Sequence, residues 1–234
     1  MTAILAAGGT DSSGGAGLTR DAAMAAALDV SLRPVVTAVT AQTDCAVEAV
    51  YPAAPEEVAA QALAALATAP GPRAVKTGMI GSPALAAALA AVLPLEIPLV
   101  LDPVLKASSG GDLMPADGFN GLLQRAALIT PNLPELAELS GRGGSMEAQV
   151  ETLLAEGVQA ILVKGGHGAG RDSTDHLFTA SGEEHVFAAP RLAVSRRGTG
   201  CSLATAIACH LAKGETLAEA CRAAKSAVRR WLAG

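Results

Sequence analysis

The residue types with the clearest chemical potential lie near the C-terminal end of the chain, in Gly198-Thr199-Gly200-Cys201. An apolar helical pattern follows directly, over residues 203–211. Glycines let the backbone approach an anion closely, and the first turn of a helix directs unpaired N–H groups at it. The helix dipole and the neighbouring Arg196 and Arg197 would favour the thiolate of Cys201. The segment is therefore either an anion site with a reactive thiol or an ordinary turn with a buried cysteine.

Residues that could bind a ligand also follow the end of each predicted strand. Short apolar runs predict six strands, at residues 2–6, 34–40, 74–77, 99–102, 128–130 and 160–164. Glycine or polar residues stand at or after every one of these ends: the loop 8–17, Gln42, Gly78, Asp102, Asn132 and Lys164-Gly165-Gly166. Parallel sheets bind their ligands at the carboxyl ends of their strands. The sequence therefore predicts one active site along that edge.

The elements that must position these residues alternate along the chain. Helical patterns fill the gaps between strands, at residues 15–28, 55–67, 83–93, 115–125, 133–139, 146–156, 199–212 and 217–231. Strands separated by helices need crossover connections, which predicts an α/β fold with a mostly parallel sheet covered on both faces. Residues 175–179 and 184–187 flank Ser181-Gly182 and predict a small hairpin at one edge. We expect a single domain over residues 1–234.

Composition limits the function classes. The chain has 234 residues, of which 50% are hydrophobic and 17% charged, and a formal net charge of −5. This balance argues against nucleic acid or an anionic membrane surface as partner. Its four cysteines show neither zinc spacing nor a disulfide framework, and the N-terminus does not read as a signal peptide. We therefore expect a cytoplasmic protein with no membrane span.

Each polar segment also has a simpler interpretation. The loop 8–17 holds five glycines and matches neither the Walker nor the dinucleotide pattern, so it either caps the next helix or wraps a small polar substrate. Gln42 offers a donor and an acceptor that suit a heterocycle edge, but alone it is only a polar residue at a strand end.

The charged segments leave similar choices open. Asp102 is either a cap or a functional carboxylate. Asn132 and Glu135 have capping-box spacing, and Glu135 has the alternative of holding magnesium through water. Lys164 would be costly to bury unpaired, which makes a phosphate a reasonable partner.

Taken together, these segments resemble the hydroxymethylpyrimidine/phosphomethylpyrimidine kinases of thiamine biosynthesis, within the ribokinase-like superfamily. The matching segments are Gly9-Thr10-Asp11-Ser12-Ser13-Gly14-Gly15-Ala16-Gly17, Thr40-Ala41-Gln42, Val75-Lys76-Thr77-Gly78-Met79, Leu101-Asp102-Pro103-Val104, Ile129-Thr130-Pro131-Asn132-Leu133-Pro134-Glu135, Lys164-Gly165-Gly166-His167 and Gly198-Thr199-Gly200-Cys201. They span nearly the whole chain. The resemblance implies a ribokinase-like three-layer fold.

The resemblance also implies an activity and a role for each matching residue. ATP would phosphorylate the hydroxymethyl group of 4-amino-5-hydroxymethyl-2-methylpyrimidine, and then the monophosphate to the diphosphate. By position, Cys201 would be the base, and Gly198, Thr199 and Gly200 would form the anion hole. The pyrimidine pocket would consist of Gly9, Asp21, Gln42, Met79 and Val104. Asn132 and Lys164 would bind the nucleotide, and Asp102 and Glu135 would hold magnesium. Relatives of this kind commonly form homodimers through an edge of the sheet.

Two departures and three alternatives accompany this prediction. Arg197 stands where the family usually has histidine, and we expect it to contact phosphate on the nucleotide side. The segment 105–109 rearranges a stretch that often carries a lysine later, and such changes bear most on the second phosphorylation.

A pyridoxal kinase shares the Gly-Thr-Gly-Cys ending, as does a hydroxyethylthiazole kinase, in which the other motifs are less expected. A non-catalytic vitamin-binding module is the alternative from another class.

Overall fold

Continuous apolar runs form the centre of the sheet. The computed structural model describes residues 1–106, 111, 113–165, 170–194 and 196–234. Strand β1 (Ala3–Gly9) is buried at every position, as a parallel strand covered on both faces should be. The other strands are β2 (Ser31–Gln42), β3 (Val47–Pro52), β4 (Val75–Thr77), β5 (Leu99–Leu101), β6 (Leu128–Ile129), β7 (Ala160–Val163), β8 (Asp172–Thr179) and β9 (Glu184–Pro190).

These strands make one sheet in the order β3-β2-β1-β4-β5-β6-β7-β8-β9. The six strands from β2 to β7 in this order pair in parallel. β3 pairs antiparallel with β2 at one edge, and the β8–β9 hairpin pairs antiparallel with β7 at the other. The parallel strands therefore bring their carboxyl ends to one edge of the sheet, where ligands bind in such folds.

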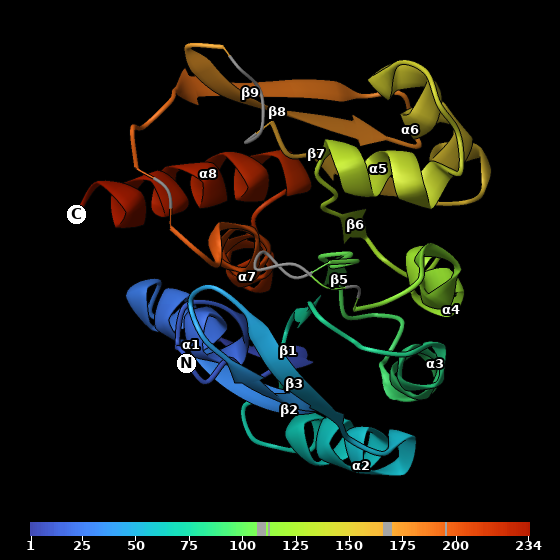
Figure 1. The fold of residues 1–234 in the computed structure, drawn as a ribbon, viewed down its shortest axis with the longest axis vertical. Coiled ribbons are helices and arrows are strands. Elements are labelled where there is room, and N and C mark those ends of the chain that lie inside the picture. The colour runs from blue at the N-terminus through green and yellow to red at the C-terminus, as the bar shows by residue number, and fades with distance from the viewer. Residues whose placement is uncertain (107–110, 112, 166–169, 195) are drawn as a thin grey trace.

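Helices cover both faces of the sheet (Figure 1). They are α1 (Gly17–Ala27), α2 (Pro55–Leu66), α3 (Pro83–Val92), α4 (Asn120–Leu123), α5 (Leu133–Ser140), α6 (Met146–Ala155), α7 (Thr199–Ala212) and α8 (Leu217–Ala233), with a short 3-10 helix at Ala116–Phe119. On one face, α2 to α6 bury one hydrophobic cluster against the strands. On the other face, α1, α7 and α8 bury a second. In the described part of the chain, none of the helices has the length and hydropathy that a bilayer span needs.

The structure confirms the α/β class, the six predicted strands and the edge hairpin. Strand β3 was not predicted, because most of its residues are exposed and it lacks the buried alternation by which a strand is recognised in a sequence. The predicted helix over 115–125 is wrong in its extent, since only the 3-10 turn and the four-residue α4 form there. Gly118 and Gly121 weaken helix formation in that stretch.

Candidate active site

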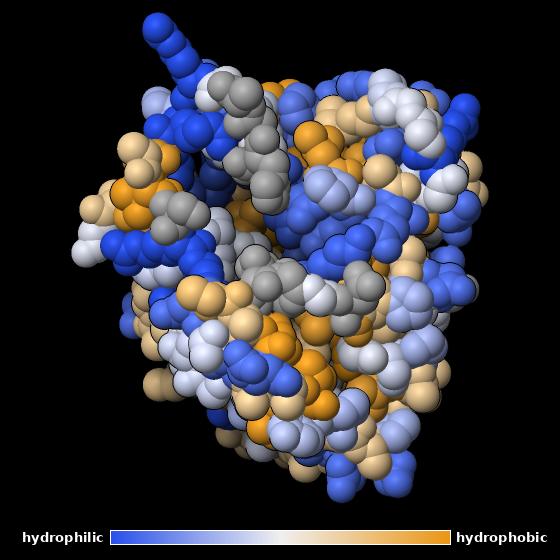
Figure 2. All heavy atoms as spheres, viewed as in Figure 1, coloured by the Kyte–Doolittle hydropathy of each residue, from blue (hydrophilic) through white to orange (hydrophobic). Residues whose placement is uncertain are grey.

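A pocket of about 910 Å³ opens at the carboxyl ends of the central strands. Residues that follow three neighbouring strands line it, namely Asp102 after β5, Asn132 after β6 and Lys164 after β7, together with the first turn of α7. Figure 2 shows this face hollowed near its middle, with hydrophilic residues on both sides of the hollow. The structure therefore brings together three of the six strand ends that the sequence singled out, and Ala16 of the loop 8–17 joins them, whereas Gln42 and Gly78 are not among the residues that line this pocket.

The Gly198–Cys201 segment is the first turn of α7, as predicted, and it lines the pocket. Gly198 precedes the helix with φ +74, a left-handed conformation that side chains rarely adopt. A Cβ there would collide with the carbonyl oxygen of Gly15 and would lie 3.2 Å from the Cα of Ala16. The loop before α1 therefore presses against this turn. A Cβ on Gly200 would lie 3.4 Å from Lys164 Nζ, so the turn also faces that ammonium.

Cys201 differs from the expectation drawn from its neighbours. Burial raises the pKa of its thiol to about 11, and the positive charge of Lys76 opposes this effect only in part. The expected lowering of the pKa by Arg196 and Arg197 is therefore wrong for the protein without substrates. Desolvation of the thiol is the largest influence on its pKa, and neither arginine is among the groups that act most strongly on it.

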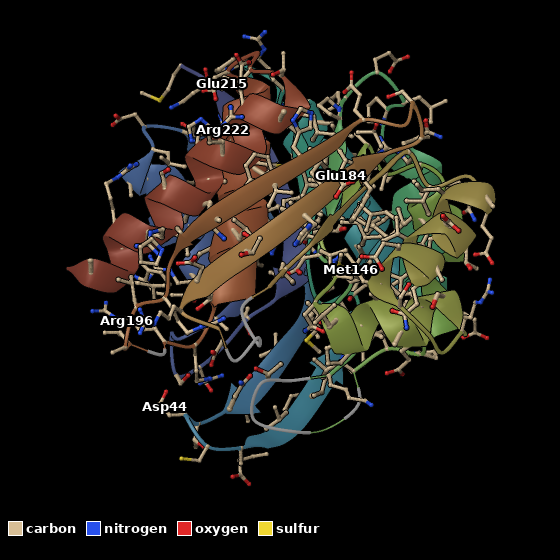
Figure 3. The ribbon with its side chains drawn as sticks, turned by 90° about the horizontal axis from the view of Figure 1, so that it is seen from above. Asp44, Met146, Glu184, Arg196, Glu215 and Arg222 are labelled. Atoms are coloured by element: carbon tan, nitrogen blue, oxygen red, sulfur yellow. The ribbon has the colours of Figure 1, made fainter. Side chains whose placement is uncertain are left out.

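Arg197 connects two loops beside the pocket. Its guanidinium donates to Ser13 Oγ at 2.7 Å and to the carbonyl oxygen of Thr43 at 3.0 Å. It also pairs with Asp11 at 3.1 Å and with Asp44 at 3.3 Å. Figure 3 shows Asp44 and Arg196 on the same side of the molecule, where the segment before α7 approaches the β2–β3 turn. Arg197 lines the pocket, and its contact with phosphate stays a prediction.

Lys164 lies between two carboxylates at the floor of the pocket. Its Nζ is 2.8 Å from Asp102 Oδ1 and 3.6 Å from Glu135 Oε2. Thr130 donates to the same oxygen of Asp102 at 3.3 Å. Burial raises the pKa of Glu135, and the positive charge of Lys164 counteracts that rise. The three charged groups therefore form one cluster, in which each carboxylate depends on the ammonium.

Asn132 and Glu135 also have the local role that their spacing predicts. Asn132 Oδ1 accepts from the backbone N–H of Glu135 at 2.9 Å, and Glu135 Oε2 accepts from that of Asn132 at 2.8 Å. This capping box begins α5 and fixes both side chains at the pocket. Capping α5 and holding a cation are therefore compatible roles for Glu135, because its carboxylate caps the helix and faces Lys164 as well.

The residues expected to bind the pyrimidine divide into three sets. Val104 lines the 910 Å³ pocket. Gly9, Gln42 and Met79 lie near the ends of β1, β2 and β4, where a Cβ on Gly9 would be 2.9 Å from Met79 Sδ. Asp21 has 0% exposed surface and is enclosed between α1, β4 and α7. The structure therefore does not place Asp21 at the pocket surface.

Sequence reasoning missed the partners that enclose Asp21. Lys76 Nζ donates to Asp21 Oδ2 at 2.8 Å, and Thr205 Oγ1 donates to Asp21 Oδ1 at 2.7 Å. The signal was present, because a lysine inside the apolar strand β4 needs an acidic partner. Two residues of another motif, Gly166 and His167, and the rearranged positions 107–109 lie outside the described residues.

Comparisons with known proteins identify the family of this chain. A model of the phosphomethylpyrimidine kinase family matches residues 11–233. The hydroxymethylpyrimidine/phosphomethylpyrimidine kinase of Streptomyces coelicolor is 40% identical, over 96% of this chain and 86% of that protein. The structure of phosphomethylpyrimidine kinase from Clostridium difficile has a TM-score of 0.82 at 31% identity, with 99% of each chain covered.

A pyridoxal kinase has a similar fold. The ADP complex of Bacillus subtilis pyridoxal kinase superposes with a TM-score of 0.86 at 27% identity, covering 97% of this chain and 90% of that one. Its identity is lower than that of the two pyrimidine kinases, although its TM-score is slightly higher than that of the Clostridium difficile enzyme. The family expected from the motifs is therefore confirmed, and the chain belongs to the phosphomethylpyrimidine kinase family.

Proposed function

We propose that this protein transfers the γ-phosphoryl group of ATP to the hydroxymethyl group of 4-amino-5-hydroxymethyl-2-methylpyrimidine. The observation that carries the proposal is the first turn of α7, which faces Lys164 and Asp102 across one pocket. Phosphoryl transfer needs positioning and charge neutralisation more than covalent catalysis. Backbone N–H groups, an ammonium and carboxylates for a metal supply these functions.

The reaction follows from the positions of these groups. The hydroxymethyl oxygen attacks the γ-phosphorus, the bond to ADP breaks, and the hydroxyl proton passes to the Cys201 thiolate. The N–H groups of the first turn of α7 and the ammonium of Lys164 stabilise the charge on the transferring phosphoryl group. Proton removal by Cys201 keeps positive charge from building up on the attacking oxygen as its bond to phosphorus forms. Gln42, near the end of β2, would read the pyrimidine edge.

The side chains at the pocket floor fit a magnesium ion. The described residues contain no cluster of three or more His, Cys, Asp or Glu side chains that could hold a metal alone. Magnesium, however, takes one or two carboxylates and completes its shell with phosphate oxygens and water. Asp102 and Glu135 already converge on one cation, the ammonium of Lys164. Bound there with ATP, magnesium would neutralise charge on the phosphates.

We propose a homodimer through the β3 edge of the sheet. Val39 and Tyr51 are paired across β2 and β3, and both are more than half exposed. Neighbouring Val50 is also exposed. Apolar side chains grouped on a sheet edge support an association with a second copy.

The choice between pyrimidine and pyridoxal is tested by ADP release. We expect ATP- and magnesium-dependent ADP release with the hydroxymethylpyrimidine, at a kcat/KM at least about tenfold above that for pyridoxal, which corresponds to about 1.4 kcal/mol. A coupled assay on the purified protein measures both substrates. A preference for pyridoxal would overturn the assignment of the hydroxymethylpyrimidine as the substrate. Binding of both substrates in calorimetry with no ADP release would support a non-catalytic vitamin-binding module.

A further inference from the structure

Lys76 is a charged side chain to which the mechanism above gives no role. It lies on β4, and only 1% of its surface is exposed. Its Nζ donates to Asp21 Oδ2 at 2.8 Å, and Asp21 itself is completely buried. A Cβ on Gly78 would lie 2.7 Å from the same Nζ. The ammonium therefore points toward the carboxyl end of β4, where the active site lies.

The arrangement around Lys76 leads to Cys201. Asp21 also accepts a hydrogen bond from Thr205 Oγ1 at 2.7 Å. Thr205 lies four residues after Cys201 in α7, so the two side chains share one helix face, one turn apart. The Lys76–Asp21 pair is thus attached to the face of α7 that carries the thiol. This places a fixed positive charge beside the first turn of the helix.

A purely structural role explains this pair poorly. A buried ion pair costs desolvation energy that the attraction between its charges often fails to offset, and apolar residues of similar size are often equally stable there. The charged groups that act on the thiol also differ in sign. Lys76 acts on Cys201 as a cation, whereas Asp21 and Asp102 act as anions.

We propose that Lys76 is a positioning residue for phosphoryl transfer: held by Asp21 beneath the first turn of α7, its ammonium stabilises negative charge on the Cys201 sulfur. The inference rests on the proposed function of Cys201 as base and gives it a physical cause. Burial raises the pKa of Cys201, and Lys76 is the strongest of the influences that lower it. The interaction is mutual, because burial lowers the pKa of Lys76 while Asp21 and a Cys201 thiolate raise it to a net value above normal.

The charged groups that face Cys201 come from four elements. Lys76 acts from β4, Asp21 from α1 and Asp102 from the end of β5. Lys164, after β7, also interacts with the thiol. Lys76 is distinguished from Lys164 by its enclosure, because Lys164 lines the pocket and is shared with two carboxylates there. The charge of Lys76 therefore stays in place whether or not nucleotide is bound.

The test is the rate of alkylation of Cys201 by iodoacetamide in the free protein, followed by mass spectrometry of the Cys201 peptide between pH 7.5 and about 9. Only the thiolate reacts, so the rate below the pKa follows the thiolate fraction. We expect Lys76→Met to lower the rate about three- to tenfold, since each pKa unit lowers the thiolate fraction tenfold while the remaining thiolate becomes about threefold more nucleophilic. Substrates are absent, so this result is independent of whether the protein phosphorylates a pyrimidine.

Lys225→Met is the matched control. Lys225 forms another buried lysine–aspartate pair, 2.7 Å from Asp175, and it is not among the groups that act most strongly on Cys201. We expect this variant to lose stability as Lys76→Met does and to keep the wild-type alkylation rate. Equal rates in Lys76→Met and wild type, or equal losses in the two variants, would overturn the proposal. So would a faster rate in Lys76→Met, which would indicate local opening.

A double variant covers the case in which Lys76→Met fails to fold. Asp21→Asn/Lys76→Met removes both charges and leaves no unpaired carboxylate in the core. Lys76 acts more strongly on Cys201 than Asp21 does, so this variant should also react more slowly than wild type. An unchanged or faster rate would contradict the proposal. In the kinase assay, the rise of kcat with pH should move to higher pH in the same variant.

Discussion

Cys201→Ala is expected to lower kcat for the pyrimidine by about 10²- to 10⁴-fold, the usual contribution of a general base. The dissociation constant of the pyrimidine should change little, because the thiol acts on the hydroxyl proton and does not read the ring. Measurement of kcat by ADP release and of binding by calorimetry separates these effects. Cys209→Ala is the matched control, since Cys209 lies on the same helix with 0% exposed surface.

The same variant predicts a change in pH dependence. Burial raises the pKa of Cys201 to about 11, so at neutral pH the thiol is almost fully protonated and its thiolate fraction increases about tenfold per pH unit. Wild-type kcat should therefore rise between pH 7 and about 9, and Cys201→Ala should lose this rise. An unchanged kcat, or a pH profile identical to wild type, would show that Cys201 is not the base.

Gly198→Ala is expected to abolish most of the turnover and to lower stability as well. The new Cβ would meet the carbonyl oxygen of Gly15 and would lie 2.9 Å from Arg20 Cγ, so the loop before α1 or the first turn of α7 has to move. The left-handed conformation adds about 1–2 kcal/mol of strain. Because anion binding depends on the direction of the N–H groups in that turn, displacement of even 1 Å should cost about 10²-fold in kcat.

Gly214→Ala provides the control at the opposite end of the same helix. Gly214 has φ +91 and nothing within 4 Å of its potential Cβ. The variant should therefore be less stable only by the cost of the conformational strain, about 1–2 kcal/mol in urea unfolding, and its kcat should be unchanged. If Gly198→Ala resembled Gly214→Ala in both measurements, close packing of the turn against the loop before α1 would have no part in catalysis.

Local patterns account for what could be predicted from the sequence. The central strands are continuous apolar runs because both of their faces are buried, and they were recognised for that reason. The Asn132–Glu135 capping box was equally readable, since its two hydrogen bonds span only three residues. The position of the active site followed from these elements and from the rule for parallel sheets.

Contacts between distant segments account for what could not be predicted. Lys76 and Asp21 are 55 residues apart, and Arg197 and Asp11 are 186 apart. Neither pairing has a signal at fixed spacing, and both depend on how the helices pack on the sheet. The error over Cys201 has the same origin, because neighbouring arginines and the helix dipole are visible in the sequence, whereas the desolvation of the thiol in the folded protein is not.

The proposed phosphoryl transfer is tested by product analysis of the wild-type protein by mass spectrometry, after incubation with ATP, magnesium and the hydroxymethylpyrimidine. We expect the pyrimidine monophosphate to form first and the diphosphate to follow, with one ADP released for each phosphoryl group transferred. Cys201→Ala, incubated in parallel, should form little of either product. Failure of the wild-type protein to phosphorylate the pyrimidine, while ATP and pyrimidine both bind, would contradict the proposal that this protein is a pyrimidine kinase.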